Sequence, residues 1–174
     1  MKRILFLNGN PDAGNGAFDA YCTSVTEALS AAGNVVRPLL LRDMKIGDCL
    51  GCYDCWLKTP GICVRRDDHV EVLKGYVWGD LAVLASPVRM GFVSAQIKKA
   101  HDRMIPLVHP FLQLSGDRMA HLPRYEKTAR TGLLIDPGSD TESLDIISKV
   151  YEGAVFLKTT ERPAKEVADE IDGI

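Results

Sequence analysis

Residues 2–18 have the sequence KRILFLNGNPDAGNGAF, and this stretch decides the fold class. The run Ile4–Leu7 is apolar without alternation, which is typical of a parallel strand buried on both faces. Asn8-Gly9-Asn10-Pro11 ends the strand, because these residue types favour turns. Apolar residues then recur at helical spacing up to Ala32, where Gly33-Asn34 ends the predicted helix. The stretch therefore predicts a strand, a glycine-rich loop and a helix in succession.

The rest of the chain repeats this alternation. Further strands are predicted at Val35–Leu41, Asp80–Ser86, Arg130–Asp136 and Ala154–Thr159, with helical patterns between and after them. We expect one α/β domain over residues 1–174, a flavodoxin-like three-layer sandwich with a five-stranded parallel sheet in the order 2-1-3-4-5. Residues 44–66 form a cysteine-rich loop, and residues 105–128 contain three prolines and show no clear period.

Composition excludes several classes of protein. Hydrophobic residues make up 46% and charged residues 25% of the chain, as in soluble globular proteins. The 21 basic and 23 acidic residues are interspersed, so no basic stripe for nucleic acid is present. The first apolar run is too short for a signal peptide or a membrane span. We expect a cytoplasmic protein that binds neither nucleic acid nor membrane.

In a sheet of this order, ligands bind outside the carboxyl ends of the strands, where three loops converge. The first loop offers backbone N–H groups and a helix dipole to a phosphate, and the other two lie where a flavin ring would bind. The candidate cofactor-binding residues are Asn8, Gly9, Asn10, Pro11, Asn15, Gly16, Ala17 and Phe18 in the first loop, Ser86, Pro87, Val88, Arg89, Met90 and Gly91 in the second, and Asp136 and Gly138 in the third.

Each of these assignments has a plainer alternative. The glycines of the first loop could only relieve strain in a turn, and the guanidinium of Arg89 could favour a reduced anionic ring or form a surface ion pair. The first loop also lacks the lysine of a nucleoside triphosphate loop and the three-glycine dinucleotide fingerprint. An NTPase or a Rossmann dehydrogenase is therefore disfavoured.

Four of the five cysteines lie within fifteen residues, at Cys49, Cys52, Cys55 and Cys63. Three thiolates at intervals of three residues, closed by a fourth, are close to the ferredoxin pattern and favour a [4Fe-4S] cluster. Zinc and the absence of any metal are the alternatives. The fifth, Cys22, falls on the first predicted helix and is interpreted as a core residue.

Three motifs together resemble a known family. The stretches LNGNPDAGNGAF, CLGCYDCWLKTPGICVRRDD and SPVRMGFVSAQIKKAHDR are similar to those of the NADPH-dependent FMN reductase-like flavoproteins, and the cysteine motif to the iron-sulfur flavoprotein branch. The resemblance implies noncovalent FMN, a homodimer or homotetramer, and Cys49, Cys52, Cys55 and Cys63 as cluster ligands. It also implies electron transfer from a ferredoxin-like donor to a small acceptor. Where relatives place Ser or Thr hydroxyls on the phosphate, this chain offers backbone amides and Asn side chains.

Three functional hypotheses follow. The first is an FMN-dependent oxidoreductase with a [4Fe-4S] cluster, whose chemistry belongs to the cofactors rather than to catalytic side chains. The second is a cluster-free FMN or quinone reductase that takes hydride from NAD(P)H. The third is a non-enzymatic interaction module in which zinc binds the four cysteines.

Overall fold

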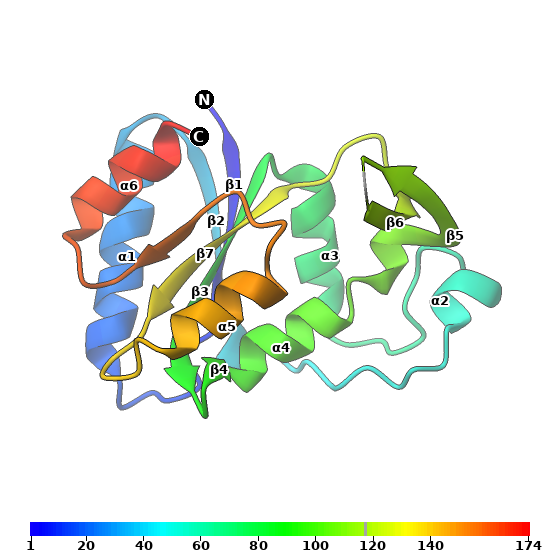
Figure 1. The fold of residues 1–174 in the computed structure, drawn as a ribbon, viewed down its shortest axis with the longest axis horizontal. Coiled ribbons are helices and arrows are strands. Elements are labelled where there is room, and N and C mark those ends of the chain that lie inside the picture. Colours follow the sequence, from blue (N-terminus) through cyan, green and yellow to red (C-terminus); the bar gives the residue numbers. More distant parts are fainter. Residues whose placement is uncertain (117) are drawn as a thin grey trace.

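The computed structural model describes residues 1–116 and 118–174, and its centre is a twisted parallel sheet (Figure 1). The strand order is β2-β1-β3-β7-β8, which confirms the predicted 2-1-3-4-5 order. These strands are β2 (Val35–Leu40), β1 (Arg3–Asn8), β3 (Leu81–Arg89), β7 (Arg130–Asp136) and β8 (Leu157–Thr159). The short β4 (Phe92–Val93) adds an antiparallel partner to β3, so the sheet has six strands rather than the predicted five.

Helices cover both faces of the sheet, as Figure 1 shows. One face packs against α1 (Gly16–Ala31) and α6 (Ala164–Asp172), and the other against α3 (His69–Trp78), α4 (Ala95–Asp102) and α5 (Ser143–Val150). Strand β1 supplies both cores, with Ile4 and Phe6 on the first face and Leu5 and Leu7 on the second. An uninterrupted apolar run is therefore what this strand requires, because it has no exposed face.

The second predicted loop begins later than expected. Residues Ser86–Arg89 belong to β3, although Pro87 indicated a break after Ser86. The chain then reverses at Met90 and Gly91, whose φ angles are +51° and +75°, and returns as β4. Two central residues with positive φ are the usual connection of a tight hairpin. The second candidate loop is therefore the end of a strand and a hairpin turn.

The segment without a clear sequence pattern contains a separate hairpin. Strands β5 (Val108–Ser115) and β6 (Arg118–Pro123) pair with each other and lie beside the short α2 (Asp54–Leu57) of the cysteine-rich region (Figure 1). Two short 3₁₀ helices, η1 (Leu41–Asp43) and η2 (Ile105–Leu107), complete the elements described. Within the described ranges, the helices are all too short or too polar to cross a membrane.

Candidate functional site

The carboxyl ends of the three central strands lie at the same edge of the sheet. In the parallel register, Asn8 of β1 is opposite Ala85 of β3, and Pro87 of β3 is opposite Asp136 of β7. The first and third loops leave the sheet after Asn8 and Asp136, and the hairpin turn follows at the end of β3, after Arg89. The structure therefore brings together the three segments that the sequence assigned to one ligand.

Ser94, which the sequence analysis did not single out, connects two of these segments. It is fully buried, and its hydroxyl donates to the carbonyl oxygen of Gly9 at 2.6 Å while its amide donates to the hydroxyl of Ser86 at 2.8 Å. A side chain at Gly9 would meet Ile97 at 2.3 Å, so only glycine allows this close approach. Ser94 also caps α4, and N-cap patterns are the signal that could have identified it.

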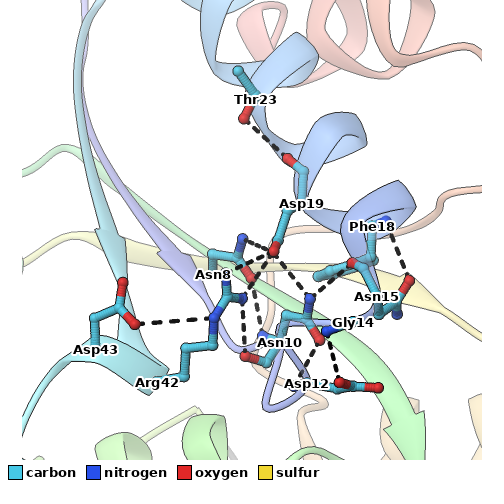
Figure 2. A network of polar contacts seen from close by, with 10 residues as sticks. All are labelled: Asn8, Asn10, Asp12, Gly14, Asn15, Phe18, Asp19, Thr23, Arg42 and Asp43. Atoms are coloured by element: carbon cyan, nitrogen blue, oxygen red, sulfur yellow. Dashed lines mark hydrogen bonds and ion pairs between the residues drawn. The ribbon is translucent and has the colours of Figure 1, made fainter.

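The side chains of Asn8 and Asn10 are used inside the first loop (Figure 2). Asn8 accepts from the amide of Asn10 at 2.9 Å and donates to Asp19 at 2.8 Å. Asn10 is fully buried, accepts from the amide of Asp12 at 3.1 Å, and donates to the Asn15 carbonyl and to Asp19, both at 3.0 Å. Both asparagines therefore shape the loop, and the surface that a ligand would meet is the backbone.

An ion pair between Asp19 and Arg42 lies beside this loop. Asp19 in the first turn of α1 lies 2.8 Å from Arg42, which also donates to the Asn10 carbonyl at 3.5 Å (Figure 2). Burial alone would raise the pKa of Asp19, but hydrogen bonds from Arg42, Asn10 and Asn8 outweigh it and hold the pKa below its usual value. Asp19 is therefore a fixed negative charge, and Arg42 compensates it next to the loop. No local sequence pattern marks this pair, because the two residues lie 23 positions apart.

The loop presents free donors at the beginning of α1. Asn15 caps the helix by accepting from the amide of Phe18 at 3.4 Å. Among the described residues, the amides of Ala13, Gly16 and Ala17 have no hydrogen-bond acceptor. A side chain built on Gly16 would meet no atom within 4 Å, so the space beside these amides is open. Free amides and a helix dipole at one open position suit an anion.

The other two segments form the remaining edge of the site. Met90 is fully exposed at the tip of the β3–β4 hairpin, and Arg89 donates to the carbonyl of Val88 at 3.2 Å. The third loop turns at Gly138, whose φ is +55° and whose amide donates to Asp136 at 3.2 Å. The hairpin turn and the third loop therefore lie at the same edge of the sheet as the first loop.

The four clustered cysteines border one small cavity, and all are free thiols. Left-handed residues separate them, with φ of +62° at Gly51 and +55° at Tyr53. Left-handed backbone at a non-glycine residue costs of the order of 1 to 3 kcal/mol and concentrates at functional sites. Within residues 1–116 and 118–174, no three His, Cys, Asp or Glu side chains form a group that could bind a metal ion.

The cysteines differ in environment. Cys49 and Cys52 are exposed, Cys63 is partly buried, and Cys55 is buried. Burial, followed by the neighbouring thiol of Cys63, raises the pKa of Cys55. Cys22 lies apart, on α1, in the core that the sheet forms with α1 and α6, where burial raises its pKa to about 12.

Comparison with curated proteins gives iron-sulfur flavoproteins, which confirms the resemblance found in the sequence. The chain is 34% identical over 109 residues to an iron-sulfur flavoprotein of Archaeoglobus fulgidus, a match that covers 63% of this chain and 48% of the relative. It is 32% identical over 105 residues to an iron-sulfur flavoprotein of Methanocaldococcus jannaschii, covering 60% and 53%. The chain spans about half the length of these relatives. No protein-family model matches it.

Solved structures confirm the flavodoxin-like fold. An NAD(P)H:quinone oxidoreductase from Methanothermobacter marburgensis superposes with a TM-score of 0.65 at 15% identity, covering 98% of this chain and 90% of that one. An FMN-dependent NADH-azoreductase from Bacillus anthracis, in complex with FMN, gives 0.64 at 13% identity, covering 99% and 98%. At such identities the likeness establishes the fold alone.

Proposed function

We propose that this chain, similar along part of its length to iron-sulfur flavoproteins, is an FMN-dependent oxidoreductase that also binds a [4Fe-4S] cluster. The observation that carries the proposal is the convergence of three strand-end segments around the open, unpartnered amides at the beginning of α1. Every helix begins with amides that lack an acceptor within the helix, so it is their position beside the two other strand-end segments that indicates a ligand. The similarity to proteins named iron-sulfur flavoproteins supports the choice of ligand.

The first loop binds the phosphate of FMN. The amides of Ala13, Gly16 and Ala17 donate to phosphate oxygens, and the dipole of α1 favours their negative charge. The positive charge of Arg42 offsets the negative charge of Asp19, so Asp19 repels the phosphate less than an unpaired carboxylate would. Asn8, Asn10 and Asn15 hold the loop open in advance, so little ordering is left to occur on binding.

The hairpin turn and the third loop hold the ring. Backbone amides of Val88, Arg89 and Met90 are the proposed donors to the ring carbonyls and N5, and Asp136 and Gly138 of the third loop would also border the ring. When bound, FMN supplies hydride and single-electron chemistry. The role of these residues is to position the ring and to tune its electronics.

The thiol set fits a cluster in its chemistry. Four free cysteines border one cavity, and soft thiolates are the ligands of iron-sulfur clusters. Cys49, Cys52, Cys55 and Cys63 are the proposed ligands. A cluster, when bound, would supply one-electron transfer between the flavin and a partner.

The proposed donors are NAD(P)H or a ferredoxin-like protein, and the proposed acceptor is a small molecule. Similarity of fold to reductases named for NAD(P)H and NADH supports the nicotinamide donor. We also propose one functional domain over residues 1–174 and a homodimer or homotetramer, as the family resemblance implies.

Anaerobic purification with quantitation of flavin, iron and acid-labile sulfide tests the proposal. We expect bound FMN together with iron and sulfide in equal molar amounts. FMN without iron would instead indicate a cluster-free NAD(P)H-dependent reductase, and zinc without flavin would indicate an interaction module. Cys49→Ser should lose iron and keep FMN, whereas Cys22→Ala, outside the cysteine cavity, should keep both.

A further inference from the structure

The cysteine-rich region is closed at a narrow neck, which we define as Lys45, Gly47, Asp67 and Asp68. The amide of Asp68 donates to the carbonyl of Lys45 at 3.1 Å, and the carboxylate of Asp68 accepts from the amide of Lys45 at 2.7 Å. The carboxylate of Asp67 accepts from the amide of Gly47 at 3.0 Å. All four clustered cysteines lie between the two sides of this neck.

The side chain of Arg103, the residue directly after α4, lies at this neck. It is 2% exposed, and its Nη1 donates to Asp67 at 2.6 Å and to the carbonyl of Gly47 at 3.0 Å. Its Nη2 donates to the Sγ atom of Cys63 at 3.3 Å. One guanidinium therefore contacts both sides of the neck and one of the clustered thiols.

Stability alone is a weak reason for this arrangement. Burying a guanidinium and a carboxylate costs desolvation energy that a well-packed apolar pair would avoid. Arg103 also leaves its Nε atom buried without an acceptor among the described residues. The planar guanidinium nevertheless places two separate nitrogen atoms on different partners, whereas lysine has a single nitrogen.

Helix α4 connects this neck to the loops proposed to bind FMN. Its N-cap, Ser94, contacts Gly9 and Ser86, and its C-cap is Arg103. The helix has eight residues, which at 1.5 Å per residue gives a length of about 12 Å. One short rigid element therefore sets the position of both proposed cofactors.

We propose that Arg103 is a positioning residue that fixes Cys63 and raises the reduction potential of the cluster, an inference that rests on the proposed function. Reduction adds one electron and forms or breaks no covalent bond at the ligand. The added negative charge is shared by the ligand sulfurs, so an N–H donor to Cys63 stabilises the reduced state more than the oxidised state. Asp67 holds the guanidinium in the orientation that this bond requires.

Arg103→Lys tests the inference because it keeps the positive charge and removes the fork. The matched control is Arg66→Lys, an exposed arginine in the same region. Both variants and the wild type are purified anaerobically, and the cluster is titrated with dithionite while the reduced signal is followed by electron paramagnetic resonance. We expect the equilibrium constant for reduction to fall about tenfold in Arg103→Lys, a shift of ~59 mV to lower potential. Arg66→Lys should titrate as the wild type does.

Each outcome decides the question. Wild-type potential in an iron-loaded Arg103→Lys protein would overturn the inference, as would an equal shift in Arg66→Lys. Loss of iron from Arg103→Lys with retained FMN and circular dichroism would support the fixing of Cys63, and the reduction potential would then be decided by the nitrogen coupling measured on the wild type. Wild-type protein that contains FMN but no iron or sulfide would refute the proposed cluster itself, and the inference with it.

A measurement on the wild type covers the case in which Arg103→Lys does not fold. Protein labelled with ¹⁵N only at arginine is reduced, and pulsed electron paramagnetic resonance searches for a nitrogen coupling to the cluster. We expect a coupling, because a guanidinium nitrogen lies 3.3 Å from a ligand sulfur. A reduced cluster without an arginine coupling would contradict the inference.

Discussion

Gly16→Asp tests the phosphate site. Gly16 is the first residue of α1, and a Cβ atom added to it would have no atom of the described residues within 4 Å. The new carboxylate would fit sterically and would stabilise the first turn through the helix dipole, by about 0.3 to 1 kcal/mol. It would also lie next to the amides proposed to bind the phosphate. Protein stability and FMN affinity are therefore expected to change in opposite directions.

The size of the loss follows from charge and exposure. At about 5 Å in a water-like dielectric, two unit charges repel by about 0.8 kcal/mol. Because Gly16 is exposed, the water-like value applies, and a phosphate carries about −1.5 to −2 charges. The expected loss is about 1.5 kcal/mol, or roughly a 12-fold weaker Kd for FMN at low salt.

Quenching of flavin fluorescence measures this Kd in apoprotein. Gly16→Asn is the neutral control of similar size, and riboflavin is the ligand without a phosphate. We expect Gly16→Asp to weaken FMN binding while Gly16→Asn and all riboflavin affinities change little. If FMN and riboflavin lose affinity equally, or if neither does, the phosphate does not bind at the beginning of α1.

Three further changes have defined outcomes. Gly9→Ala should lower the free energy of unfolding, measured in urea, by about 1 to 3 kcal/mol, because the methyl group would lie 2.3 Å from a side-chain carbon of α4. The control Gly153→Ala, whose methyl group would meet open space, should have little effect. Equal effects of the two substitutions would contradict the packing argument. Burial would raise the pKa of Asp67, but the hydrogen bonds that its carboxylate accepts lower the pKa to about 2, below the 3.8 of the unfolded chain. The ionised carboxylate therefore stabilises the fold by about 2 kcal/mol above pH 4, and this stabilisation is lost as the pH falls toward 2. Urea unfolding of wild type and Asp67→Asn should therefore differ at pH 6 and converge near pH 2, and a constant difference would refute this linkage. Iodoacetamide should modify Cys49 before Cys22 in native apoprotein, as mass spectrometry would show, because Cys22 is buried with a pKa of about 12; early modification of Cys22 would contradict its place in the core.

The sheet could be predicted because its signals are local. The central strands β1 and β3 contain short apolar runs, and strands buried on both faces need no alternation. The predicted end of β3 at Ser86 is wrong. Pro87 lacks an N–H donor and usually stops a strand, but β3 continues three residues past the predicted end, to Arg89. The β5–β6 hairpin was missed because its prolines and mixed polar residues hide the alternation of a strand.

The candidate site was predicted in outline but not in its supporting side chains. Loops at strand ends follow from topology, so their convergence could be inferred without coordinates. Asp19 and Arg42 act through partners distant in sequence, and no local pattern marks them. Ser94 carries a helix N-cap pattern, but its partner Gly9 is 85 positions away. Arg103 lies among polar residues that suggest a solvated helix face, and its partner Asp67 is 36 positions away. Such pairings depend on the finished fold.

The most direct test of the proposed flavin site is a titration of ¹⁵N-labelled, iron-free protein with FMN, followed by amide correlation spectra. The largest shifts should fall on Gly16, Ala17, Met90 and Gly138, and riboflavin should reproduce those at Met90 and Gly138 while leaving Gly16 and Ala17 nearly unchanged. Shifts centred instead on the apolar cavity beside α3, at Leu73 and Trp78, would place the ligand elsewhere and contradict the proposed function.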